Sequence, residues 1–141
     1  MKAASRASTV LACASALIVG GFVSLFTAGP ALFADGPFDQ RMPVLAASVV
    51  GFALVGLAIG LAAPAAWKPA AICLALSALP VVAFFGRDTV SQPLMAMLSV
   101  GFALGDAAAG VFGVWSGARI RFARAARRDA TGAVESEESP A

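Results

Sequence analysis

Asp106 is the residue best placed to do chemistry, because it is the one charged residue inside the apolar stretch Thr89–Ala118. An ionised carboxylate at the centre of a membrane-spanning helix costs about 2.5–3.5 kcal/mol on insertion scales. We therefore expect Asp106 to be protonated, hydrogen-bonded to a partner or facing a water-filled cavity. Two interpretations stay open: a site that binds a proton or cation or contacts a partner protein, and a carboxylic acid that is bonded within the fold.

The hydrogen-bonding partners available to Asp106 at membrane depth are few. The hydroxyl candidates are Ser24, Ser48, Ser77 and Ser99. Main-chain carbonyls near Pro80 are also candidates, because proline cannot donate a hydrogen bond within a helix. No Lys or Arg lies in the apolar stretches to pair with the carboxylate.

Other chemistry is excluded by the residue types that the chain lacks. It has no His and no Tyr, which excludes His metal ligands and Ser–His or Cys–His nucleophile pairs. Its two cysteines, Cys13 and Cys73, cannot complete a tetrahedral metal site and form no CxxC motif. We interpret them as free thiols and predict a protein that is not an enzyme and holds no metal or cofactor.

The elements that must position Asp106 are membrane-spanning helices. Hydrophobic residues make up 60% of the 141 residues and charged residues 13%, against about 45–50% and about 25% in soluble domains. Four apolar stretches are each long enough for one spanning helix of about 20 residues. The sequence predicts an all-α integral membrane bundle of four transmembrane helices, over roughly residues 9–28, 43–63, 69–85 and 93–117.

Turn-forming residues and the two ends complete this organisation. Gly29-Pro30 and Gly36-Pro37 predict a loop over residues 29–41 after the first span, and Pro43 is typical of the first turn of the second. Pro80 is expected to kink or weaken the third span. The transmembrane domain is expected over residues 9–118. Residues 119–141 then form a basic juxtamembrane segment and a short disordered acidic tail.

Residues 1–8 are a short polar segment, and such a segment can precede either an uncleaved first span or the hydrophobic region of a cleaved signal peptide. Here the apolar stretch is longer than the hydrophobic region of a typical signal peptide, and no clean A-x-A cleavage site follows it. We expect an uncleaved helix preceded by a cytoplasmic N-terminus.

The distribution of basic residues predicts that both termini are cytoplasmic. With that orientation, eight of the ten Lys and Arg residues lie inside, and Arg41 and Arg87 lie outside, as the positive-inside rule requires. Trp67 and Trp115 then end the second and fourth spans at the inner interface, where aromatic residues are enriched. The abundance of Ala, Gly and Arg is typical of bacteria with GC-rich genomes, so we expect a bacterial inner membrane.

Small residues recur every fourth position and predict close helix packing, because small side chains let helix backbones approach in lipid. The predicted packing residues are Gly20 in the first span, Gly56 and Gly60 in the second, and Gly101, Gly105, Gly113 and Gly117 in the fourth. We interpret the first and fourth spans as the tightly packed pair, or the fourth as an oligomer face.

A cluster of five arginines follows the fourth span: Arg119, Arg121, Arg124, Arg127 and Arg128. Ordinary positive-inside anchoring explains such a cluster, and contact with anionic lipid is the sharper alternative. Nucleic-acid binding is disfavoured, because the cluster adjoins a span and has only Phe122 as an interleaved aromatic residue.

The sequence therefore predicts a small multi-pass membrane protein whose partner is the lipid bilayer. The first functional hypothesis is a non-enzymatic structural or accessory subunit, packing as a homo-oligomer or into a larger membrane complex through its Gly and Ala stripes. The alternative is a small transporter or channel, or a subunit of one, that uses Asp106 to bind a proton or cation.

Overall fold

A computed structural model describes residues 2–33, 38–85 and 93–137 of the chain, and within these ranges every element is helical. The elements in order are α1 (Lys2–Phe33), α2 (Phe38–Ala62), the 3-10 helix η1 (Pro64–Ala66), α3 (Trp67–Leu76), α4 (Leu79–Phe85) and α5 (Pro93–Glu137). The expected all-α class is confirmed for the described residues.

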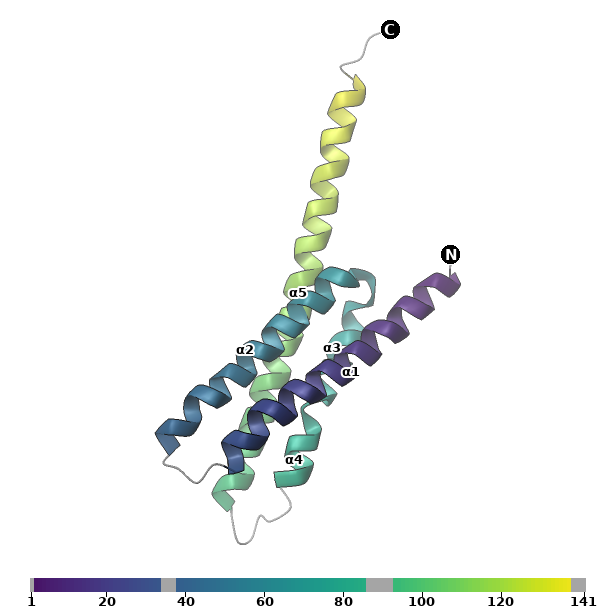
Figure 1. Cartoon of the computed structure of the whole chain (residues 1–141). Helices are drawn as coiled ribbons and strands as arrows, with labels where there is room; N and C mark the ends of the chain where they lie inside the picture. The colour runs from purple at the N-terminus through teal and green to yellow at the C-terminus, as the bar shows by residue number, and fades with distance from the viewer. Residues whose placement is uncertain (1, 34–37, 86–92, 138–141) are drawn as a thin grey trace.

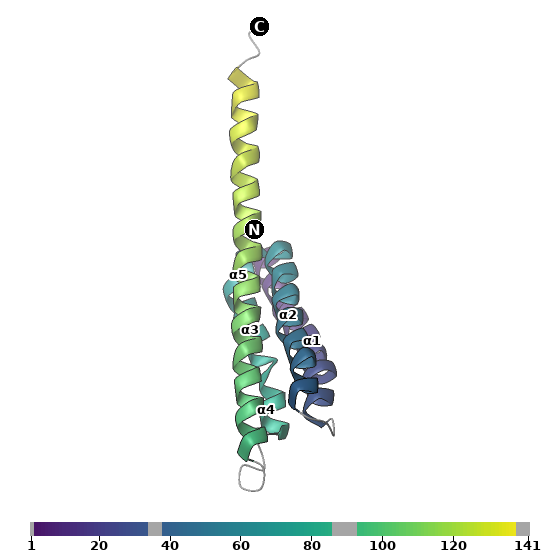
Figure 2. The ribbon, with the colours of Figure 1, turned by 90° about the vertical axis from the view of Figure 1, so that its left-hand side faces the viewer.

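The helices run up and down a single bundle (Figure 1). The start of α1, the connection from α2 through η1 to α3, and the C-terminal part of α5 lie toward one end. The end of α1, the start of α2, the end of α4 and the start of α5 lie at the other. Both ends of the described chain therefore lie toward the same end of the bundle, and α5 extends well past the other helices there (Figure 2).

Three segments in the described part of the chain are long and apolar enough to cross a membrane: Arg6–Thr27, Met42–Ala62 and Ala96–Arg128. Their mean hydropathies are 2.2, 2.5 and 1.6. They coincide with the first, second and fourth predicted spans, which supports a membrane protein. Many side chains exposed on these segments are large and apolar, which suits contact with lipid.

The third predicted span is divided into two short helices. α3 ends at Leu76, and Ser77 and Ala78 form a turn before α4 begins at Leu79. Pro80 accounts for the position of the break, because it has no N–H to donate to the carbonyl of Leu76 and its ring would collide with that carbonyl. The Ser77 amide donates to the carbonyls of both Cys73, at 3.1 Å, and Leu74, at 3.2 Å. The second of these bonds tightens the last turn of α3.

The helices are longer at several ends than the turn-forming residues predict. α1 continues past Gly29-Pro30 to Phe33, and α2 begins at Phe38, so that Pro43 lies inside the helix instead of in its first turn. The predicted loop over this stretch is therefore wrong for residues 29–33 and 38–41, and residues 34–37 lie outside the described ranges. Membrane helices tolerate proline when neighbouring helices and local adjustments satisfy the freed carbonyls.

The predicted disordered tail is also wrong as far as the structure describes it. α5 continues without interruption to Glu137, and residues 138–141 lie outside the described ranges. The Ala and Arg residues after the span are strong helix formers, and they propagate a helix that packing has already nucleated. At 1.5 Å per residue, the extension from Arg119 to Glu137 is about 28 Å long.

Helix pairing differs from the expected pairing of the first and fourth spans. α5 packs chiefly on α2 and secondarily on α3, whereas α1 packs on α2 and α3 and meets α5 only slightly. The expectation that α1 and α5 form the tight pair is wrong. Small residues recur at every fourth position on both α1 and α2. Which of the two helices packs against α5 depends on the contacts between whole helix surfaces.

Candidate functional site

Asp106 lies in the interior of the bundle, where it is 1% exposed. The Ser48 hydroxyl on α2 donates a 2.8 Å hydrogen bond to Asp106 Oδ2. Ser48 is itself fully buried, so this bond joins α2 and α5 away from lipid and water. The structure thus selects Ser48 among the four hydroxyls that the sequence offers as partners.

Contacts one helical turn further along α2 and α5 show how far along the bundle axis the Ser48–Asp106 pair lies. The Leu74 side chain of α3 lies within 3.0 Å of where a Cβ on Gly110 of α5 would stand, and the Phe52 ring of α2 lies within 3.4 Å of it. A Cβ on Gly20 of α1 would likewise stand 2.7 Å from Leu74. Gly20, Phe52, Leu74 and Gly110 therefore share one level of the bundle.

Ser24 belongs to the same level as the Ser48–Asp106 pair. Ser48 and Asp106 precede Phe52 and Gly110 by four residues, and Ser24 follows Gly20 by four residues on α1, which runs in the opposite direction (Figure 1). A four-residue step is about one turn along the same helix face. Three polar residues from α1, α2 and α5 thus form one layer, which we call the polar layer.

The polar layer contains two buried oxygen atoms that lack hydrogen-bond partners among the described residues. These atoms are Ser24 Oγ and Asp106 Oδ1. Ser24 is 1% exposed, so neither atom is served by bulk solvent. Burying such a group without a partner costs about 1–3 kcal/mol. Asp106 Oδ1 is thus a buried acceptor without a donor, and protonation of the carboxyl group would remove the cost of an unpaired charge there.

The remaining two serines are satisfied by their own helices. The Ser77 hydroxyl donates to the Leu74 carbonyl at 2.6 Å, and the Ser99 hydroxyl donates to the Ala96 carbonyl at 2.8 Å. Both are buried. Such back-bonding to the preceding turn is common for serine in membrane helices, and it leaves the polar layer as the place where buried polar groups of different helices meet.

Above the polar layer, α2 and α5 touch through their backbones. A Cβ on Gly56 would stand 2.9 Å from the Val114 nitrogen, and one on Gly60 would stand 2.9 Å from the Ala118 nitrogen. From the other helix, a Cβ on Gly113 would stand 3.0 Å from the Leu57 nitrogen. One on Gly117 would stand 2.9 Å from the Leu61 nitrogen. We call this contact the glycine interface.

The glycine interface uses residues within one chain. Gly56, Gly60, Gly113 and Gly117 are all buried. Gly113 and Gly117 are therefore not free to form the oligomer face that was one interpretation of the fourth span. Gly20 is also buried, but against α3. Each of these glycines is required because backbone atoms or a close side chain occupy the place of a Cβ.

The other two predicted packing glycines lie in a different environment. Gly101 is exposed, and no atom outside its own helix turn lies within 4 Å of where its Cβ would stand. At Gly105 the nearest such atom is Val49 Cγ2 at 3.7 Å, an ordinary van der Waals distance. Neither residue takes part in the glycine interface.

The arginine cluster lies along the part of α5 that extends from the bundle. Arg119, Arg121, Arg124, Arg127 and Arg128 are all exposed. Arg121, Arg124 and Arg128 line one hollow of about 250 Å³ together with Ala125, so these three side chains share a helix face. Arg119 differs, because its guanidinium lies 4.6 Å from the centre of the Trp115 ring.

Sequence reasoning missed one juxtaposition of reactive side chains. Cys13 on α1 and Cys73 on α3 lie close enough for their thiols to interact, and they form no disulfide. Spacing along the chain does not indicate this contact, because only the packing of α1 on α3 brings the two residues together.

No family model, curated protein or solved structure matches the chain. Within the described residues, no group of three or more His, Cys, Asp and Glu side chains could hold a metal ion.

Proposed function

We propose that the protein is a multi-pass protein of a bacterial inner membrane, with four crossings and both termini in the cytoplasm. Three described helices are long and apolar enough to cross, and α3 and α4 follow each other down the bundle as a fourth, broken crossing (Figure 1). The location of both ends of the described chain toward one end of the bundle supports this topology. The excess of Lys and Arg at that end supports a cytoplasmic location for it.

Within this topology we propose a non-enzymatic structural or accessory role. One observation carries the proposal: α5 is a single helix of 45 residues that is fixed to α2 by the glycine interface and then extends beyond the bundle (Figure 2). Residues 121–128 are exposed along the extension. A helix anchored in this way transmits the position of the membrane domain to whatever contacts the extension, which is the property of a connecting subunit.

Truncation after Ala118 tests the accessory role. The truncated protein keeps the glycine interface, so its unfolding in detergent should match that of the full chain. We expect the full chain, purified from native membranes in mild detergent, to carry a partner or a second copy in fixed ratio. The truncated chain, purified in the same way, should not carry it. A full chain that carries nothing in fixed ratio, or a truncated chain that keeps the same partner, would contradict the proposal.

A second candidate function is proton or cation binding at Asp106, as in a small transporter or channel. The unpartnered Asp106 Oδ1 and Ser24 Oγ in the polar layer favour it, because intramembrane ionisable residues commonly serve ion pathways. The test is ion flux into vesicles that contain the purified protein. Flux that Asp106→Asn abolishes and Ser99→Ala leaves intact would support the function, and absence of flux from the unmodified protein would contradict it.

A further inference from the structure

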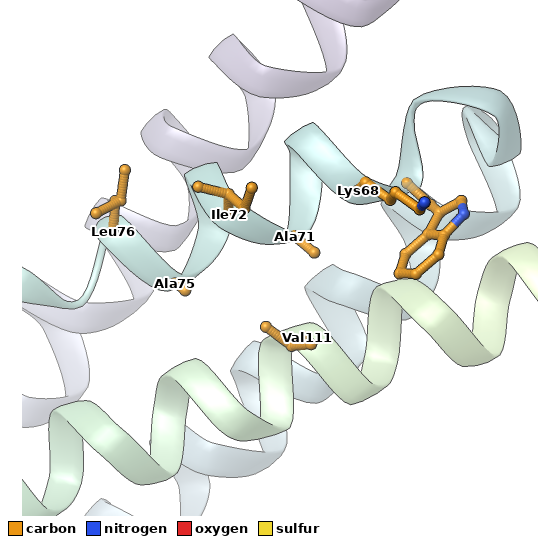
Figure 3. A pocket seen from close by; sticks show the side chains of 7 residues that line it. Lys68, Ala71, Ile72, Ala75, Leu76 and Val111 are labelled. Carbon is orange, nitrogen blue, oxygen red and sulfur yellow. The ribbon is translucent and has the colours of Figure 1, made fainter.

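A groove runs along the outside of the bundle between α3 and α5 (Figure 3). Its volume is about 450 Å³, and its lining consists of Trp67, Lys68, Ala71, Ile72, Ala75, Leu76 and Val111. Ala71 and Ala75 point from α3 toward Val111 on α5 (Figure 3). The small side chains of the two alanines keep the space between the helices open. Apart from Lys68, the lining is apolar, so the groove suits a hydrocarbon chain.

A second hollow continues this groove along α5. It has a volume of about 810 Å³ and shares Trp67 and Val111 with the first. The rest of its lining is Leu104, Ala107, Ala108, Phe112 and Trp115. No acidic residue lines either hollow. Together they form one apolar surface that is bounded at one end by the two tryptophans.

The tryptophan end of this surface carries two cations. Lys68 Nζ lies 5.7 Å from the centre of the Trp67 ring, and the Arg119 guanidinium lies 4.6 Å from the centre of the Trp115 ring. Both distances allow cation–π attraction, which holds the charged groups beside the rings. Lys68 and Arg119 are exposed, and tryptophan rings favour the level of the lipid headgroups. The charge therefore lies where a lipid phosphate would lie.

We propose that this surface binds an anionic phospholipid, with an acyl chain in the α3–α5 groove and the phosphate between Lys68 and Arg119. The groove from Lys68 to Leu76 is about 12 Å long, which is close to the roughly 15 Å hydrocarbon depth of one leaflet. Basic groups at the headgroup level attract anionic lipids. The site does not depend on whether the protein is an accessory subunit or a transporter.

Fluorescence quenching by brominated lipid tests the proposal, because the two tryptophans of the chain both line the surface. The full-length protein is placed in phosphatidylcholine vesicles that contain either brominated phosphatidylglycerol or brominated phosphatidylcholine. We expect the anionic lipid to associate more tightly by on the order of tenfold, given two basic residues near the surface. Equal quenching by the two lipids would overturn the proposal.

A matched pair of double variants separates a site from general electrostatic attraction. Lys68→Ala with Arg119→Ala removes the two cations at the groove, and we expect it to abolish the preference for phosphatidylglycerol. Arg124→Ala with Arg128→Ala removes the same charge from the exposed extension and should leave most of the preference intact. Equal losses in the two double variants would overturn the proposal in favour of diffuse attraction. Far-ultraviolet circular dichroism verifies that both variants keep their helices.

Discussion

The two ends of the α5 glycine stripe have the same sequence spacing and opposite environments. Gly113 and Gly117 lie against the α2 backbone, where a Cβ would collide with main-chain atoms. Gly101 faces open space, and Gly105 meets Val49 only at an ordinary contact distance. A four-residue repeat of glycine is therefore not sufficient to make an interface.

The partner helix explains the difference. Opposite Gly113 and Gly117, α2 presents Gly56 and Gly60, so small residues meet small residues and the two backbones touch. Opposite Gly105, α2 presents Val49, whose side chain separates the helices. There, Asp106 and Ser48 join α2 and α5 by a hydrogen bond instead. One half of the helix pair is held by backbone contact and the other by a buried polar pair.

The largest effect is expected from a side chain placed in the glycine interface. Gly113→Val should lower the free energy of unfolding by about 1–3 kcal/mol or more, because the new atoms meet the Ala53 carbonyl and the Leu57 nitrogen, which are backbone and cannot rotate away. Unfolding in mixtures of mild and denaturing detergent measures the change. A Gly113→Val protein as stable as the unmodified chain would show that the helices are not closely packed there.

The second-largest effect is expected in the polar layer, where Ser48 and Asp106 join the other half of the α2–α5 pair. Ser48→Ala leaves Asp106 without its hydrogen bond and should lower the free energy of unfolding by about 1–3 kcal/mol. Ser24→Ala, the matched control, removes a hydroxyl that already lacks a partner and should be neutral or stabilising. If Ser24→Ala is as destabilising as Ser48→Ala, the Ser24 hydroxyl has a partner and is not an open position of the polar layer.

A smaller effect of opposite sign is expected at Gly105. A Cβ there finds room beside Val49, and alanine is a better helix former than glycine by up to about 1 kcal/mol. Gly105→Ala should therefore raise the free energy of unfolding slightly in the same detergent assay. A marked loss of stability would show that α2 and α5 are as close here as at Gly113.

The smallest effect is expected at Gly101, which faces open space. Gly101→Leu should raise the free energy of unfolding by somewhat less than Gly105→Ala does, because leucine is a slightly poorer helix former than alanine and the new side chain meets no other helix. The same variant, examined by crosslinking in native membranes, reports on contacts between chains. Loss of a crosslinked species without loss of stability would place a partner on this face of α5.

Much of the architecture could be predicted from residue types alone. Long uncharged stretches predicted the helices that the structure shows over Arg6–Thr27, Met42–Ala62 and Ala96–Arg128, because the apolar character of a stretch is a local property. The expected kink at Pro80 appears as a complete break after Leu76. The loop predicted from Gly29-Pro30 was wrong, because the continuation of α1 there depends on surroundings that the dipeptide does not encode.

Residue types and their order along the chain account for the helical class, the apolar character of the helices and the isolation of Asp106 among apolar neighbours. The pairing of α5 with α2, the bond from Ser48 to Asp106 and the level of Ser24 depend instead on how the helices pack in three dimensions. Stripes of small residues occur on several helices, so in lipid the choice among them depends on the fit of whole helix surfaces, not on hydrophobic burial.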